Sequence, residues 1–207
     1  MIRTLSLVAV LSTAVHAEEL AQVGQPAPTF RLPVYNAEGF GESFVALDRY
    51  VGPSRVEPSG KVLVVSFMAS FCGPCKKEMP WLQRLHEENR ERGLRVMMVA
   101  IDAEEEGQKK ISELIAQHQV TFPVAKDRFN IVARRWLGPQ SPLPSVFLVR
   151  PDGTVSSVHR GYSDDGAELL ASALDGVLGV AVSRPVVEAP PVVAPPVESQ
   201  PKTKKKK

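Results

Sequence analysis

Two cysteines stand three residues apart in the segment SFMASFCGPCKKEMP, which runs from Ser66 to Pro80, and the chain has no others. At this spacing the two side chains lie about one turn apart on one face of a helix, close enough to form a disulfide or to bind one ion together. A disulfide that closes so short a loop removes little entropy from the unfolded chain and would add little stability. Cys72 and Cys75 are therefore better candidates for redox chemistry than for a structural crosslink.

Gly73 and Pro74 separate the two cysteines. Proline is favoured at the first position of a helix, so we predict that a helix begins here. Cys72 would then lie beside the free N–H groups and the partial positive charge of the helix N-terminus, which stabilise a thiolate and lower its pKa. Cys75 would lie one turn deeper, on the apolar face. We predict that Cys72 is the nucleophile and that Cys75 is the resolving thiol that attacks the mixed disulfide.

Metal binding is the alternative use of two thiols. A structural zinc site needs four ligands, and three of the four histidines, His86, His118 and His159, lie outside the N-terminal segment and far from the pair in sequence. Copper(I) handling by the two thiolates stays open as an alternative function, with Met68 or Met79 as an added soft ligand. We expect no cofactor and no resident metal. A net charge of +2 with 6% aromatic residues gives no reason to expect a nucleic-acid partner.

Apolar runs alternate along the chain with segments of helical spacing. The strands and helices that these patterns predict must position the cysteine pair. The runs at 62–67 and 94–101 are rich in β-branched residues and typical of strands buried on both faces. Helical spacing follows each run, which indicates crossover connections and parallel strands. The turn Pro151-Asp152-Gly153 predicts an antiparallel hairpin. The expected strands are 62–67, 94–101, 122–125, 145–149 and 154–160, and the expected helical segments are 73 onward, 104–118, an apolar-spaced stretch at 129–137, and 164–179.

The two ends of the chain differ in character from this α/β domain. Residues 1–17 combine Arg3, a short apolar run and a small-residue site at Ala17, which is typical of a cleaved secretory signal peptide. Residues 183–207 are rich in Pro and Val and end in lysines, which predicts a disordered tail. We expect this tail to be solvated, with weak electrostatic contact with an anionic membrane or wall as the alternative. We therefore predict one folded domain at 18–182 in a periplasmic or otherwise extracytoplasmic protein, where disulfides persist.

The segment VVSFMASFCGPCKKEMPWL resembles the active-site segment of thioredoxin-fold proteins. The pieces VGQPAPTFRL, CKKEMP and SPLPSVFLVRPDGTV are similar to the exported TlpA/ResA branch of that family, and the resemblance spans roughly residues 23–178. It implies a thioredoxin-like fold, with a central mixed sheet flanked by helices and an added N-terminal hairpin. The implied activity is thiol-disulfide exchange, usually reduction of disulfides in exported proteins and sometimes in apocytochrome c, with a membrane thiol reductase as electron donor.

The resemblance also implies roles for single residues. Cys72 and Cys75 match the nucleophilic and resolving thiols of the family. Pro144 matches the cis-proline that faces the disulfide and receives substrate backbone, with Pro142 as the rival candidate. The residues that the resemblance places along the substrate groove are Phe71, Gly73, Pro74 and Leu143.

Glu78 matches an acid that ResA-like proteins carry three residues beyond the second cysteine, where it could exchange protons with the thiols. The alternative is a solvated carboxylate near the start of the helix. Two positions depart from the thioredoxin pattern. Ser66 stands where thioredoxins hold a buried aspartate, so that role is vacant or passes to Glu78, and Phe71 replaces the usual tryptophan. Ala69 stands where peroxiredoxin relatives need a threonine, so peroxidase chemistry is not expected.

Overall fold

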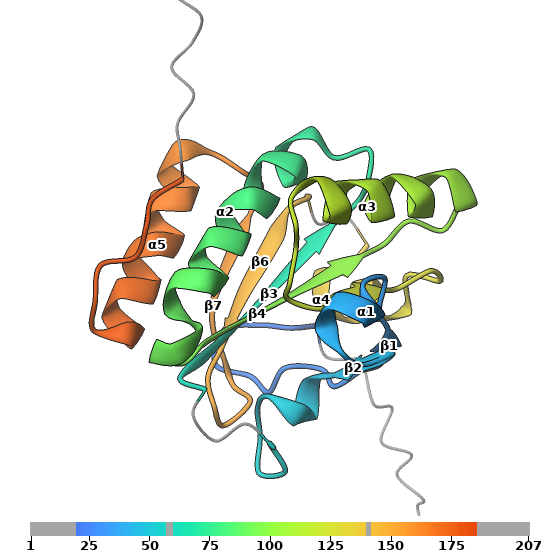
Figure 1. Cartoon of the computed structure of the whole chain (residues 1–207). Coiled ribbons are helices and arrows are strands. Elements are labelled where there is room, and N and C mark those ends of the chain that lie inside the picture. Colours follow the sequence, from blue (N-terminus) through green and yellow to red (C-terminus); the bar gives the residue numbers. More distant parts are fainter. Residues whose placement is uncertain (1–19, 57–59, 140–141, 186–207) are drawn as a thin grey trace, which may run out of the picture.

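A five-stranded sheet forms the centre of the computed structural model, which describes residues 20–56, 60–139 and 142–185. The strand order is β5-β4-β3-β6-β7, with β3, β4 and β5 parallel and with β6 antiparallel to both of its neighbours (Figure 1). The strands are β3 (Val62–Met68), β4 (Leu94–Ala100), β5 (Val124–Lys126), β6 (Ser145–Val149) and β7 (Val155–Arg160). The mixed sheet predicted from the sequence is confirmed.

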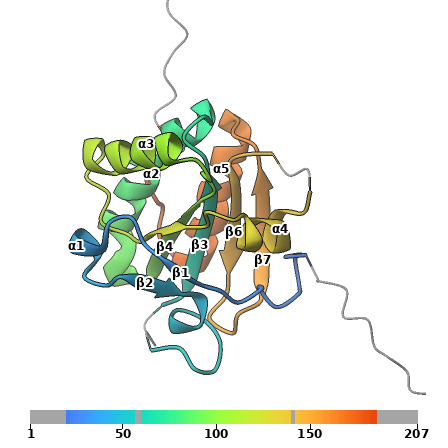
Figure 2. The ribbon, with the colours of Figure 1, turned by 90° about the vertical axis from the view of Figure 1, so that its right-hand side faces the viewer.

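Helices cover both faces of this sheet (Figures 1 and 2). Successive side chains of a strand point to opposite faces, so β3 supplies Val64 and Met68 to one core and Val65 and Phe67 to the other. The helices on the first face are α2 (Gly73–Asn89), α3 (Glu105–Gln117) and α5 (Asp164–Leu178). Helix α4 (Ile131–Leu137) packs on the second face. The strand β3 therefore lies between two apolar cores and is buried along its whole length.

A small N-terminal unit completes the second face. Its two strands, β1 (Arg31–Pro33) and β2 (Phe44–Ala46), pair antiparallel and form the expected hairpin extension. A single-turn helix, α1 (Ala37–Phe40), lies between them and was not predicted from the sequence. Two 3-10 turns follow β2 and α2, at Leu47–Arg49 and Arg90–Arg92. One bridge between Val34 and Ala125 joins the unit to the edge strand β5.

Helix α4 begins later than the apolar spacing indicated. The sequence pattern included Phe129 in the apolar stretch, but this side chain is 71% exposed and precedes the helix. The cause is the carboxylate of Asp127, which accepts hydrogen bonds from the backbone N–H groups of Ile131 (3.0 Å) and Ala133 (2.7 Å). These bonds satisfy donors that a helix N-terminus leaves free, so the helix begins after Asn130.

The packed domain continues beyond the boundary predicted at residue 182. The indole N–H of Trp81 donates to the carbonyl of Ser183 at 2.8 Å, and Arg184 pairs with Asp175 at 2.8 Å and Glu168 at 3.0 Å. These contacts hold Ser183 and Arg184 on the domain, although the sequence placed them in the tail. The signal peptide predicted at 1–17 and the rest of that tail lie outside the described residues. Within the described ranges, no helix is long and apolar enough to cross a membrane.

A substitution at Trp136 tests how much packing in the second core contributes to stability. The ring of Trp136 is fully buried between Phe30, Phe67 and Phe147, and its indole N–H donates to the carbonyl of Pro28 at 2.9 Å. We expect Trp136→Ala to lower the free energy of unfolding by about 3–5 kcal/mol, measured by urea denaturation. The control Val177→Ala, at an exposed position of α5, should change it by less than about 0.5 kcal/mol. Equal small losses in both variants would contradict this view of the core.

Candidate active site

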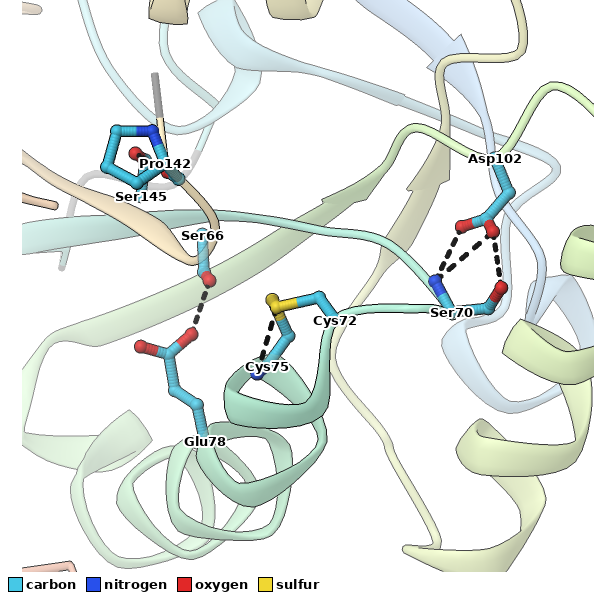
Figure 3. The surroundings of a disulfide bond; sticks show 8 residues. All are labelled: Ser66, Ser70, Cys72, Cys75, Glu78, Asp102, Pro142 and Ser145. Atoms are coloured by element: carbon cyan, nitrogen blue, oxygen red, sulfur yellow. Dashed lines mark hydrogen bonds between the residues drawn. A yellow bond between two sulfur atoms is a disulfide. The ribbon is translucent and has the colours of Figure 1, made fainter. Parts of the chain in front are cut away.

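The two cysteines form a disulfide at the start of α2, with their Cα atoms 5.3 Å apart (Figure 3). Cys72 is the last residue before the helix, and Cys75 lies in its first turn. The backbone N–H of Cys75 donates to the sulfur of Cys72 at 3.1 Å. The sulfur therefore occupies the position of a helix-capping acceptor, where free N–H groups and the helix dipole favour negative charge.

The surroundings of the disulfide differ between its two ends. The side chain of Cys75 is 0% exposed, whereas Cys72 retains 7%. Phe71, directly before it, is 78% exposed, and Gly73 and Pro74 are exposed as well. An approaching molecule can thus reach the sulfur of Cys72 over the surface of these three residues, and it cannot reach Cys75 without a change in structure.

The bond between Leu143 and Pro144 is cis. Pro144 is the residue before β6, and β6 pairs with β3 so that Ser145 lies opposite Phe67. The carbonyl of Pro144 accepts from the N–H of Gly161 at 2.7 Å. The cis bond therefore lies at the sheet edge from which β3 leads to Cys72. Leu143 is half-buried, and the carbonyl of the exposed Pro142 accepts a hydrogen bond from the hydroxyl of Ser145.

Glu78 is buried, and the alternative of a solvated carboxylate is wrong. It lies three residues beyond Cys75 and therefore on the same side of α2, as Figure 3 shows. Its carboxyl oxygen Oε2 accepts a hydrogen bond of 2.7 Å from the hydroxyl of Ser66. Burial raises the pKa of Glu78 to about 7, and the bond from Ser66 acts in the opposite direction. A carboxyl group with this pKa can hold or release a proton near neutral pH.

Ser66 is fully buried in the middle of β3 and faces α2. A serine hydroxyl cannot serve as an acid or base near neutral pH as an aspartate does at this position in thioredoxins. It can, however, orient a neighbouring carboxyl group through a hydrogen bond, and here it binds Glu78. The only titratable carboxyl group of this pair is thus the one on the helix.

Asp102 completes the site, although no pattern in the sequence singled it out. Its carboxylate accepts two bonds from the backbone N–H of Ser70, at 3.0 and 3.1 Å, and one of 2.6 Å from the Ser70 hydroxyl (Figure 3). The strands β3 and β4 are parallel with Met68 opposite Ala100, so the residue two positions after each strand meets its counterpart. An acid directly after a buried strand was the signal that could have identified it. Asp102 therefore holds the loop that ends at Cys72.

The carboxylate of Asp102 also affects Gly107, through close contact, and Tyr35, through its charge. A Cβ atom built on Gly107, in the first turn of α3, would clash with the Asp102 Oδ1 atom, so α3 approaches Asp102 more closely than alanine allows unless the carboxylate moves. The pKa of Tyr35 is raised to about 12, first by burial and then by the negative charge of Asp102. Within the described part of the chain, no three His, Cys, Asp or Glu side chains gather to hold a metal ion.

Known proteins resemble this chain over most of the domain. The model of the AhpC/TSA family matches residues 23–158. The thiol-disulfide oxidoreductase ResA of Oceanobacillus iheyensis is 29% identical over 153 residues, which cover 74% of this chain and 72% of that protein. A ResA of Bacillus cereus is 31% identical over 139 residues, 67% of this chain and 69% of its own. The crystal structure of a suspected thiol:disulfide interchange protein DsbE from Chlorobium tepidum has a TM-score of 0.62 and 27% identity, and the match covers 76% of this chain and 99% of that one.

The hydrogen bonds between Asp102 and Ser70, here called the clamp, can be tested by substitution of Gly107, which lies against the Asp102 carboxylate. Alanine normally stabilises a helix relative to glycine by about 1 kcal/mol. We expect Gly107→Ala to lower the free energy of unfolding instead, because its Cβ displaces the Asp102 carboxylate. Asp102→Ala should cost about 1–3 kcal/mol, because it leaves the buried N–H of Ser70 without a partner. In the Asp102→Ala background Gly107→Ala should cost less than alone, and strictly additive losses in denaturant titrations would contradict the clamp.

The buried Glu78 predicts a pH dependence of stability. The folded protein keeps the proton up to about pH 7, whereas an unfolded chain releases it near the ordinary value of 4.5. The folded state thus binds more protons between these values, so this stabilisation is present below about pH 4.5 and is lost as the pH rises through 7. From pH 5 to 8, the free energy of unfolding of the oxidised protein should fall more steeply than that of Glu78→Gln. Parallel pH profiles from urea denaturation would refute this assignment.

Proposed function

We propose, since the chain belongs to the AhpC/TSA family and is a thiol-disulfide oxidoreductase, that it reduces disulfides in proteins outside the cytoplasm. The observation that carries the proposal is the contrast between the two cysteines at the start of α2. The sulfur of Cys72 accepts a backbone N–H and the residue keeps 7% exposure, whereas Cys75 is fully enclosed. This contrast supports an outer thiol that attacks substrate and an inner thiol that waits for the mixed disulfide.

The reaction begins with both cysteines reduced. The thiolate of Cys72 attacks one sulfur of the substrate disulfide, forms a mixed disulfide and releases the other substrate sulfur as a thiolate, which takes up a proton. The thiolate of Cys75 then attacks the sulfur of Cys72, forms the Cys72–Cys75 disulfide and releases the second substrate sulfur. Two electrons pass from the protein to the substrate, and the two protons lost by Cys72 and Cys75 are equal in number to those gained by the substrate thiols.

We assign Glu78 as the group that receives the proton of Cys75. Cys75 is enclosed by protein and needs a nearby base before it can attack. Glu78 lies on the same side of α2, is held by Ser66, and has a pKa of about 7, which suits proton exchange with a thiol at neutral pH. The buried position of Ser66 keeps the carboxyl oriented without adding a second charge. Glu78→Gln should therefore affect the second step of the reaction more than the first.

Substrate backbone would lie against the surface around Cys72. On one side this surface consists of the exposed Phe71, Gly73 and Pro74. On the other side are Leu143 and the cis peptide bond to Pro144, just before β6, which pairs with β3. Phe71 offers an apolar contact that needs no particular sequence in the partner. The site therefore favours polypeptide disulfides, and we include apocytochrome c, with its paired cysteines, among the candidate substrates.

The direction of electron flow is part of the proposal. The dipeptide Gly73-Pro74 between the cysteines, as in thioredoxin, supports a reducing role, although the redox partners set the direction together with the pair. A dithiol donor must return two electrons to the disulfide after each cycle, and we assign this to a membrane thiol reductase rather than a soluble cofactor. The signal-like segment at residues 1–17 supports export.

Single cysteine variants test this function. The reduced wild-type protein should reduce a protein disulfide, and Cys72→Ser should abolish the reaction, because no outer nucleophile remains. Cys75→Ser should instead accumulate a mixed disulfide between Cys72 and the substrate, detected by non-reducing electrophoresis and mass spectrometry. A Cys72→Ser protein that still reduces disulfides, or a Cys75→Ser protein that traps no partner, would disprove the assigned order.

A further inference from the structure

An apolar groove of about 440 Å³ lies between the N-terminal segment 29–33 and the segment 126–135, beside the first turn of α4. Phe30 and Leu32 line it from one side, and Phe129 and Ile131 from the other. The side chains of Phe129 and Ile131 are 71% and 55% exposed. Large apolar side chains this exposed at the mouth of a groove are typical of a surface that binds a partner.

Four cations surround the same groove, and none has a carboxylate partner within the described residues. The guanidinium of Arg31 lies over Phe44, that of Arg128 over Phe129, and the ammonium of Lys126 over Tyr35. The guanidinium of Arg135 donates to a backbone carbonyl at 2.9 Å. The cations that line the groove are Arg31, Lys126, Arg128 and Arg135.

The acids nearby offset only part of this charge. Asp127 also lines the groove, with its two carboxylate oxygens accepting N–H groups from α4, so four cations and one acid leave a formal charge of +3. Lys126 also borders a hollow that Glu105 and Glu106 line. Glu42, on the neighbouring hairpin, pairs with Arg49 at 2.6 Å instead of with Arg31. The groove therefore combines exposed apolar surface with a positive potential, which favours a partner that carries carboxylates next to apolar side chains.

The position of the groove relates it to the disulfide. The parallel strands β3, β4 and β5 end in register, with Met68 opposite Ala100 and Ala100 opposite Lys126. Cys72 follows β3 by four residues and Phe129 follows β5 by three, so both lie at the same edge of the sheet. β3 and β5 are two strand spacings apart, roughly 10 Å, but Cys72 leads into α2 on the first face and the groove lies beside α4 on the second, so a bound chain needs more residues than this spacing alone requires.

We propose that this groove binds the oxidised polypeptide substrate through a segment of acidic and apolar residues that lies several residues from the cysteine attacked by Cys72. The proposal rests on the function proposed above and names the substrate class: exported polypeptides with carboxylate and aromatic or aliphatic side chains beside a disulfide. The contact is non-covalent and adds no chemical step. A small disulfide cannot reach the sulfur and the groove together, so only polypeptides gain from it.

The test uses the full chain, reduced with dithiothreitol and then freed of it, in single-turnover reactions. One probe is a disulfide-containing peptide flanked by Glu and Phe, the second is the same disulfide flanked by Lys and Ser, and the third is bis(2-hydroxyethyl) disulfide. The variant Arg128→Glu/Phe129→Ala changes two exposed side chains of the groove. Its control, Lys61→Glu/Leu169→Ala, changes one charge and one exposed apolar residue elsewhere, with Lys61 just before β3 and hence at the opposite edge of the sheet.

The wild type and the control should reduce the acidic peptide about tenfold faster than the basic one. The groove variant should lose this preference while its rate with bis(2-hydroxyethyl) disulfide stays within twofold. Equal rates for both peptides in the wild type, or equal slowing of all three probes in the groove variant, would overturn the proposal. So would a dimer in sedimentation analysis that only the groove variant dissociates, because a second copy would then occupy the groove. Failure of the wild type on all three probes would instead refute the proposed function, and this proposal with it.

Discussion

The connection between β3 and α2 is the constraint on which the rest of the site depends. Only residues 69–72 separate a strand buried on both faces from the first turn of the helix. The N-terminus of α2 is therefore fixed relative to the sheet, and the sulfur of Cys72 meets a backbone N–H of its own helix. Asp102 holds the middle of this connection by binding Ser70. This placement alone leaves Cys72 partly exposed and encloses Cys75.

Burial of Cys75 makes its thiol hard to ionise, and one buried carboxyl group, that of Glu78, lies near enough in the fold to accept the proton. A thiol inside an apolar core is hard to ionise, because burial disfavours the charged form. Glu78 shares this core, and burial raises its own pKa towards the range in which thiols release protons. The hydroxyl of Ser66 fixes the carboxyl from β3. A thioredoxin-like aspartate at the Ser66 position would add a second acid against Glu78, so serine at that position and glutamate on the helix form a consistent pair.

Much of this arrangement could be predicted from the sequence, because local patterns determine it. β-Branched apolar runs located β3 and β4, and Gly73-Pro74 located the start of α2. The cis bond at Pro144 was expected only from resemblance to a family, with Pro142 as the rival candidate. Asp102 escaped notice because its role depends on the register between two strands, which no single segment encodes.

Burial was harder to predict than position. The family resemblance singled out Glu78, but the sequence could not tell whether water reaches its carboxyl group, because that depends on the strand beneath the helix. Phe129 shows the opposite error, since apolar character indicated a core position although the cap of α4 leaves it exposed. Ser183 and Arg184 look like part of a polar tail, and only their contacts with Trp81 and Asp175 keep them on the domain. Partners distant in sequence determine the environment of Glu78 and Ser183, whereas a cap formed by Asp127, two residues away, determines that of Phe129.

The pH dependence of alkylation at Cys72 tests the central claim most directly. In the reduced Cys75→Ser protein, the rate of reaction with iodoacetamide would be followed from pH 4 to 10. Because the sulfur lies at the N-terminus of α2, the account predicts a midpoint well below the value of about 8.5 for free cysteine. A midpoint at or above that value, or no reaction in the native protein, would contradict it.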